Sequence, residues 1–348
     1  METALDALRV LNRRYAFAEV AALLADGMDH QMSTRSVAQL HQLCAFGQRL
    51  LDLDAEDFGN EDAASGANTE TAVAARVAEA EVPADLRMRA LECRMPQSPR
   101  ETHRGALGSL RPAYRLLLEV IDARFRRFET TAVVAAVHIA SEYAPLLVWE
   151  RVLGHAGDPA LLPQSVSGAG SAWGDFDDRD CPHTKSEKSA ARRSVNVAKE
   201  NSAGWRSYLN RQHSNMSHAL AVCAATCPRP CFVYTRLDPR DAEVVTVGSR
   251  IALVLNNSAI VRLRHSAPVG HGFGVPSRSE LLEAWGRSRT SLTRLAPAIG
   301  EDDGFPLPGF AHLVSTLAGQ EMPAETLLAD TASGIEKLLS STYSAERA

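Results

Sequence analysis

Apolar residues recur at three- and four-residue spacing along most of the chain, which predicts a mainly helical protein. Residues 5–24 and 33–50 show this spacing twice in succession, so a helical hairpin is expected at the start. Residues 113–129 form a longer apolar stripe with one polar face. Residues 131–152 are apolar on nearly every side. This second pattern predicts a helix inside a bundle or against a partner chain.

One region departs from the helical pattern. It holds short runs rich in Val, Ile, Phe or Tyr, at residues 231–236, 243–247, 250–255 and 259–263. The runs are separated by residues that favour turns, namely Asp238-Pro239, Gly248-Ser249 and Asn256-Asn257-Ser258. Short strands with short connections predict a small antiparallel, barrel-like sheet. A module of this size suits docking better than it suits a catalytic cleft.

The expected fold class is therefore α+β. A helical domain is predicted over residues 1–226 and a small β-rich module over 227–275, with additional helices over 276–348. Mobile insertions are predicted near residues 54–69 and 164–201. Both are rich in polar and small residues and have few apolar ones.

Composition sets outer limits on function. The chain has 348 residues, of which 45% are hydrophobic, enough for a buried core. A net charge of -5 gives no basic footprint for strong non-specific binding of duplex DNA. The sequence opens without an apolar signal core, and no apolar run is long enough to span a bilayer. We expect reduced thiols, a cytosolic or nuclear location and no membrane partner.

Cysteine spacing raises the possibility of a zinc site. Cys223, Cys227 and Cys231 recur at every fourth position, with Cys181 and His183 upstream. Structural zinc sites usually take closely spaced ligand pairs from both arms, and this spacing differs. We expect small buried or half-buried thiols, and a zinc-stabilised nucleic-acid adaptor remains an alternative.

A second possible metal site lies in the apolar helix. His138 and Glu142 are four residues apart, but a bundle metal centre needs a matching carboxylate and histidine on another helix. No such helix is evident, and the glycine-rich stretch at 270–274 lacks the phosphate-loop pattern. No G-x-S-x-G is present either. We expect a core histidine, no catalytic residue, no cofactor and no metal, with a helical-bundle metal-dependent enzyme as the alternative.

Segments in a fixed order resemble a known family. The helix that begins Ala113-Tyr114 ends Arg126-Arg127-Phe128-Glu129, a tryptophan and tyrosine motif follows in 199–211, and the predicted strands run from Pro230 to Arg264. Their order and spacing are similar to those of the Psf-one-type subunit of the eukaryotic GINS complex, part of the replicative helicase. The family has no counterpart for the residues beyond Pro276.

The resemblance implies a non-enzymatic scaffold subunit in a nuclear heterotetramer for DNA replication. Its implied partners are the other GINS subunits, the MCM helicase ring and the CDC-forty-five protein, with only indirect contact to DNA.

The resemblance also implies two groups of site residues. The expected interface residues are Tyr114, Arg124, Arg126, Arg127, Phe128, Trp205 and Tyr208. Core packing is the other role open to Trp205 and Tyr208. The expected β-module residues are Val233, Arg236, Leu253, Leu255, Asn257, Ser258 and Arg264.

Overall fold

The computed structural model describes residues 2–28, 32–54, 82–168, 173, 181–266, 272 and 274–344. The regular elements over these residues are helices, and no strand occurs among them. The described fold is therefore all-α, and the prediction of an α+β fold is wrong. The chain divides into two compact units, unit 1 from residues 1–94 and 325–348 and unit 2 from residues 95–324.

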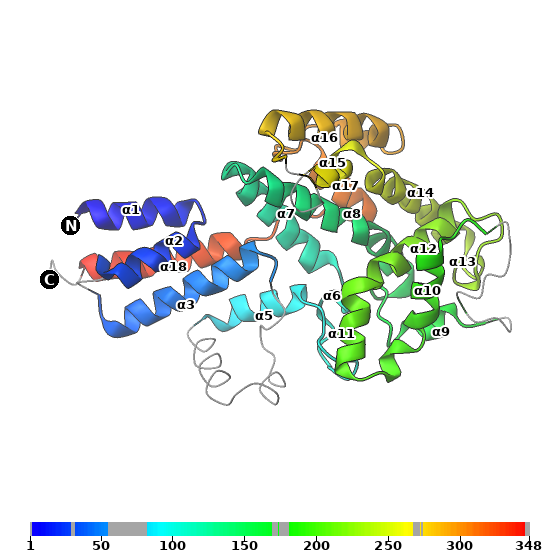
Figure 1. The fold of residues 1–348 in the computed structure, drawn as a ribbon, viewed down its shortest axis with the longest axis horizontal. Coiled ribbons are helices and arrows are strands. Elements are labelled where there is room, and N and C mark those ends of the chain that lie inside the picture. Colours follow the sequence, from blue (N-terminus) through cyan, green and yellow to red (C-terminus); the bar gives the residue numbers. More distant parts are fainter. Residues whose placement is uncertain are drawn as a thin grey trace. The chain divides into compact units, whose positions relative to one another are not determined.

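Unit 1 joins the start of the chain to its last helix. It contains α1 (Glu2–Arg13), α2 (Phe17–Leu23), the π-helical turn η1 (Leu24–Met28), α3 (Thr34–Leu51), α5 (Ala84–Cys93) and α18 (Leu327–Ser344). Helix α18 packs along α3 and also contacts α1 and α5 (Figure 1). Leu40 and Leu43 from α3 and Ile335 and Leu339 from α18 are fully buried or nearly so. The early helical hairpin predicted from the sequence thus lies in this unit.

An arginine fixes α5 to the start of α18 within unit 1. Arg89 Nη2 donates to Glu325 Oε1 at 2.5 Å, and Arg89 Nη1 donates to Asp330 Oδ2 at 2.8 Å. The same Nη2 also donates to the Thr326 hydroxyl at 2.9 Å. A guanidinium can serve several acceptors at once because its donors are fixed in one plane.

Unit 2 is built around α8 (Thr130–Leu153), a helix of 24 residues. The helices α7 (Arg111–Arg126), α12 (His213–Ala225), α14 (Pro239–Asn256), α15 (Ala259–Ser266) and α17 (Phe310–Ala318) pack against it (Figure 1). This confirms the prediction of a helix inside a bundle. By length and composition it would also suit a membrane span, so the expectation that no apolar run is long enough is wrong, but 61% of its most apolar window is buried in the protein, as in a core helix.

The remaining elements of unit 2 are shorter or more peripheral. They are α6 (Gly105–Gly108), α9 (Leu162–Val166), α10 (Lys185–Ser194), η3 (Val197–Lys199), α11 (Ser202–Arg211), α13 (Phe232–Thr235), α16 (Arg278–Thr293) and η4 (Pro297–Gly300). Helix α10 begins with a capping box in which Thr184 and Glu187 satisfy each other's backbone N–H groups.

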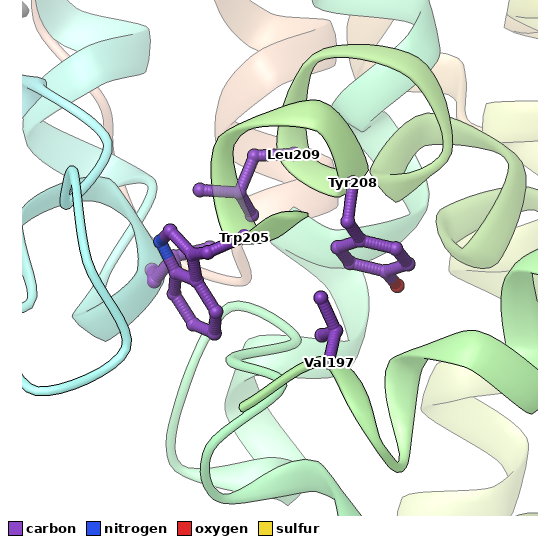
Figure 2. Close-up of a cluster of buried hydrophobic side chains, with 5 residues drawn as sticks. Val197, Trp205, Tyr208 and Leu209 are labelled. Carbon is purple, nitrogen blue, oxygen red and sulfur yellow. The ribbon is translucent and has the colours of Figure 1, made fainter. Parts of the chain in front are cut away.

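One buried cluster of unit 2 forms around α11. Figure 2 shows Trp205, Tyr208 and Leu209 of α11 against Val197, and Leu107 completes the cluster. The Trp205 indole donates to the Pro96 carbonyl at 2.7 Å, so its polar atom is satisfied inside the core.

A buried ion pair borders this cluster. Arg104 binds both oxygens of Asp158, each at 2.7 Å, and its guanidinium lies 5.3 Å from the Trp205 ring centroid. Asp158 is completely buried. The two-point contact keeps a buried carboxylate paired, because an isolated charge in that position would be strongly unfavourable.

The predicted insertion over residues 164–201 contributes to this core in the part that the structure describes. Ala190, Ala191 and Val197 are fully buried. The segment is short of large apolar residues, but alanines on one face of α10 are enough for close packing on α12. Of the other predicted insertion, 54–69, only Asp54 lies among the described residues.

The β module predicted for 227–275 is wrong, because the described residues of this region form α13, α14 and α15. The residues assigned to it are helical or lie at helix ends. Val233 is in α13 and Arg236 is its C-cap, Leu253 and Leu255 are in α14, Asn257 and Ser258 link α14 to α15, and Arg264 is in α15.

The turn signals of this region have helical roles. Asp238 is the N-cap of α14, with its side chain accepting from the Asp241 N–H at 2.9 Å, and Pro239 is the first helical residue. Gly248 lies inside α14, where a Cβ would sit 2.6 Å from Val148 Cγ1 of α8. The residues that suggested hairpin turns therefore start a helix and allow its close packing.

Candidate interaction surface

A surface feature forms where α7 ends and α8 begins. Helix α7 ends at Arg126, and Phe128 adopts a left-handed conformation with φ +62°. The Glu129 N–H then bonds to the Arg124 carbonyl at 3.0 Å, which closes the helix end as a Schellman motif. Glycine normally occupies this position because it has no Cβ to clash. Here the residue is a phenylalanine whose side chain is 68% exposed.

The Phe128 ring lies near the start of α16. Ser277 caps α16, and its hydroxyl accepts from the Glu280 N–H while the Glu280 carboxylate binds the Ser277 N–H. Arg278 follows the cap. Its guanidinium lies 4.2 Å from the Phe125 ring centroid and 5.3 Å from that of Phe128, which places one cation against both rings.

Two arginines of this corner are engaged within the chain. Arg127 Nε donates to Glu129 Oε1 at 2.5 Å, and Arg124 Nη1 binds the other carboxylate oxygen. Partial burial would raise the pKa of Glu129, but the hydrogen bonds from Arg124 and Arg127 outweigh it and hold that pKa below its usual value. Their side chains are only 13% and 16% exposed, so these cations are structural.

Arg126 differs from its neighbours. Its side chain is 75% exposed and pairs with Asp122 one turn earlier at 2.9 Å. An exposed pair of this kind contributes little to stability, so the guanidinium can exchange it for another anion. We call Arg126, Phe128 and Arg278 together the corner surface.

The other expected interface residues lie in the core of unit 2. Tyr114 is buried, and its hydroxyl donates to the Ala140 carbonyl at 2.6 Å. Burial raises the pKa of that hydroxyl well above its usual value. Trp205 and Tyr208 are fully buried as well. These aromatic side chains pack the unit and present no surface in this conformation.

The sequence did not indicate Arg278. A capping box at Ser277 marks the start of α16, and a helix was expected there. The contact of Arg278 with Phe125 and Phe128 joins segments far apart in the chain. Only the packing of α16 on the central helices brings them together.

The histidine and carboxylate of α8 do form a pair. His138 Nε2 lies 3.2 Å from Glu142 Oε1, and Arg264 Nη1 contacts the same histidine nitrogen. Burial would raise the pKa of Glu142, but His138 and Arg264 outweigh it and lower that pKa. An arginine thus occupies the space that a metal cation would need. Within the described ranges, no group of three or more His, Cys, Asp and Glu is suited to a metal ion.

The cysteines form local contacts, and Cys223 interacts with both Cys231 and Cys227. Cys223 Sγ accepts the backbone N–H of Cys231 at 2.8 Å, Cys227 Sγ donates to the Arg229 carbonyl at 3.2 Å, and Cys181 Sγ lies 3.1 Å from His183 Nδ1. Hydrogen bonding with Cys231 and burial raise the pKa of Cys223. The same hydrogen bond lowers the pKa of Cys231, so the proton of this pair lies on Cys223.

Comparison of the chain with protein-family models, curated proteins and solved structures finds no match, so the corner surface is interpreted from its geometry.

Proposed function

We propose that the chain is a non-enzymatic binding protein that holds another protein at the corner surface. The observation that carries the proposal is the exposed ring of Phe128 at a left-handed backbone position. The left-handed conformation costs about 1–2 kcal/mol for residues other than glycine, asparagine and aspartate. A folded chain has no structural need for an exposed aromatic ring there, whereas aromatic anchors are common at the centres of protein interfaces.

The charges of the corner indicate the chemistry of the partner. Arg126 is exposed, Arg278 lies against the Phe128 ring, and the nearby carboxylates Asp122 and Glu129 are already engaged by arginines. A complementary partner surface would offer an apolar recess for the ring with carboxylates around it. Opposite charges at the rim would speed association and select this orientation.

The proposal keeps only part of the GINS-type expectation. Arg126 and Phe128 contributed to that resemblance and belong to the corner surface, so binding through protein contacts remains supported by their exposure. The predicted β module was the main basis of the resemblance, and that region is helical. We therefore do not extend the proposal to GINS subunits, the MCM ring, the CDC-forty-five protein or the nucleus.

Paired variants test the proposal. Tagged chain is purified from its own cells as wild type, Phe128→Ala and Arg126→Glu, and co-purifying proteins are quantified. A partner should be retained by the wild type and reduced at least tenfold by each variant, as for a loss of about 1.4 kcal/mol or more in binding.

Matched controls separate binding from folding. Leu161→Ala removes another exposed apolar side chain, and Arg206→Glu reverses another exposed arginine. Both controls should retain the partner, and all variants should melt within a few degrees of wild type. Unchanged retention by Phe128→Ala, or no partner bound by the wild type, would show that the proposal is wrong.

A further inference from the structure

A pocket of about 280 Å³ lies in unit 2 where α8, α14 and the end of α17 meet. Its apolar lining comes from Val148 on α8, Val244, Val247 and Ile251 on α14, and Leu317 on α17. Pockets for small molecules usually measure roughly 300–1,000 Å³ and have mostly apolar walls. This one is near the lower limit and would fit a small metabolite.

Two glycines leave the pocket unfilled. Gly248 allows α14 to approach Val148, and it adds no side chain to the wall. Gly319 ends α17 with φ +67°, a conformation that glycine adopts without strain. The pocket walls at α14 and at the end of α17 are therefore formed at these two positions by backbone and not by side chains. Side chains at these positions would fill part of the space.

The charged lining residues are Arg151 from α8 and Glu243 from α14. Both are exposed, and over the residues that the structure describes neither side chain has a hydrogen bond or ion pair with the protein. Arg151 Nη1 is 3.2 Å from the place where a Cβ on Gly319 would be, so the guanidinium lies at the pocket edge. The apolar pocket thus has one cation and one anion at its edge, each available to a ligand.

We propose that this pocket binds a free apolar α-amino acid. Its carboxylate would pair with Arg151 and its ammonium with Glu243, and its side chain would pack among the valines, Ile251 and Leu317. A neutral apolar molecule would use neither charge, and a fatty acid would use only one. An apolar α-amino acid carries one group for each of the two charges and an apolar side chain for the walls. This site uses none of the residues of the corner surface.

Calorimetric titration of the full chain tests the proposal with matched probes. L-Leucine carries both charges, 4-methylpentanoate lacks the ammonium group, and isoamylamine lacks the carboxylate. Leucine should bind about tenfold more tightly than either analogue, because each analogue loses one charge-assisted contact.

Variants assign each charge to its residue. With Arg151→Gln, leucine should bind no better than isoamylamine. With Glu243→Gln, leucine should bind no better than 4-methylpentanoate. Arg250→Gln and Glu321→Gln, which change exposed charges that are not among the lining residues, should bind leucine as the wild type does.

A pocket-filling variant provides a readout that does not depend on charge. Val247 is partly exposed, so Val247→Trp should fold, shown by an unchanged melting temperature, and should abolish leucine binding. Equal affinity for leucine and both analogues would overturn the proposal. So would the absence of binding heat for leucine, valine and phenylalanine at their solubility limits. Phe128→Ala should bind leucine normally, so failure here would not bear on the corner surface.

Discussion

At the scale of single residues, the left-handed backbone at Phe128 leads us to predict an unusual order of stability for two substitutions. Both Phe128→Ala and Phe128→Gly remove the ring and its contact with Arg278. Only glycine also relieves the left-handed conformation at φ +62°. The glycine variant should therefore unfold with a free energy about 1 kcal/mol higher than that of the alanine variant. Urea denaturation of the two variants measures this difference.

An ordinary helical site is the control for that comparison. Leu282 lies inside α16 and is partly exposed. There the order should reverse, with Leu282→Ala more stable than Leu282→Gly by about 1 kcal/mol. If Phe128→Ala were the more stable variant at the corner too, the position would not be strained.

His213 predicts a pH dependence of stability. Its Nε2 donates to the Gly157 carbonyl at 3.2 Å, and its Nδ1 is buried without a hydrogen-bond partner in the described chain. Burial lowers the pKa of His213 to about 4, although Asp158 opposes the shift. The unfolded chain therefore binds this proton near pH 6.5 and the folded chain only near pH 4. The unfolding free energy should therefore decrease as the pH is lowered from 6.5 to 4, by about 3 kcal/mol from this group.

Substitution isolates the contribution of this residue. His213→Gln can still donate a hydrogen bond but cannot titrate, so stability measured by denaturation should fall less between pH 7 and pH 4. His265→Gln, at an exposed site, should keep the slope of the wild type. An unchanged slope in His213→Gln would show that the buried imidazole is not the cause.

At the scale of elements, the sequence located most helices but misassigned residues 230–264. Buried positions of α14 include Val245, Gly248, Ile251, Ala252 and Leu255, a three- and four-residue spacing that was present in the sequence. Valine and isoleucine are frequent in strands, and short apolar runs do not distinguish a strand from a buried helix. The Asp-Pro pair was interpreted as a turn, although it also starts helices. Tertiary packing on α8 decided between these possibilities.

The candidate site was predictable to a similar degree. The arginines and Phe128 at the end of α7 stood out in the sequence, but nothing in the pattern showed that Glu129 would bind two of them. The burial of Trp205 and Tyr208 was one of two roles open to aromatic residues. Which surface stays exposed depends on distant segments, and a local pattern cannot specify it.

The contact between α8 and α14 gives an element-scale prediction. Alanine normally stabilises a helix interior by about 1 kcal/mol relative to glycine. Gly248→Ala should instead destabilise the protein by about 1–3 kcal/mol, because its Cβ would collide with Val148. Adding Val148→Ala should recover part of this loss. A double-mutant cycle measured by denaturation gives the coupling, and two purely additive effects would contradict the close approach.

At the scale of the whole molecule, the chain forms two units, one from two separate segments of the sequence and one from a single segment. Unit 2 is one continuous segment, whereas unit 1 needs both 1–94 and 325–348. Leu327, Leu328, Ile335 and Leu339 of α18 are fully buried. Unit 1 therefore depends on a helix far away in sequence for much of its core.

Truncation should separate the two units. A chain ending at residue 324 should lose hydrogen-exchange protection in α1 to α3, while unit 2 keeps the protection of the full chain. Ile335→Ala is a milder version and should destabilise unit 1 alone, by about 2–5 kcal/mol. Equal loss of protection in both units would show that they do not fold separately.

The divided sequence of unit 1 has a consequence for biosynthesis. Chains emerge from the ribosome starting at the N-terminus, and domains generally fold as units during translation. Unit 2 can fold as soon as its last residue leaves the exit tunnel, but α1 and α3 lack their contacts with α18 until that helix is made, although α2 already packs on both. The apolar faces that α18 covers must stay exposed until residues 327–344 have been made. Nascent chains stalled before residue 325 should therefore bind holdase chaperones through their first helices and release them once α18 has emerged.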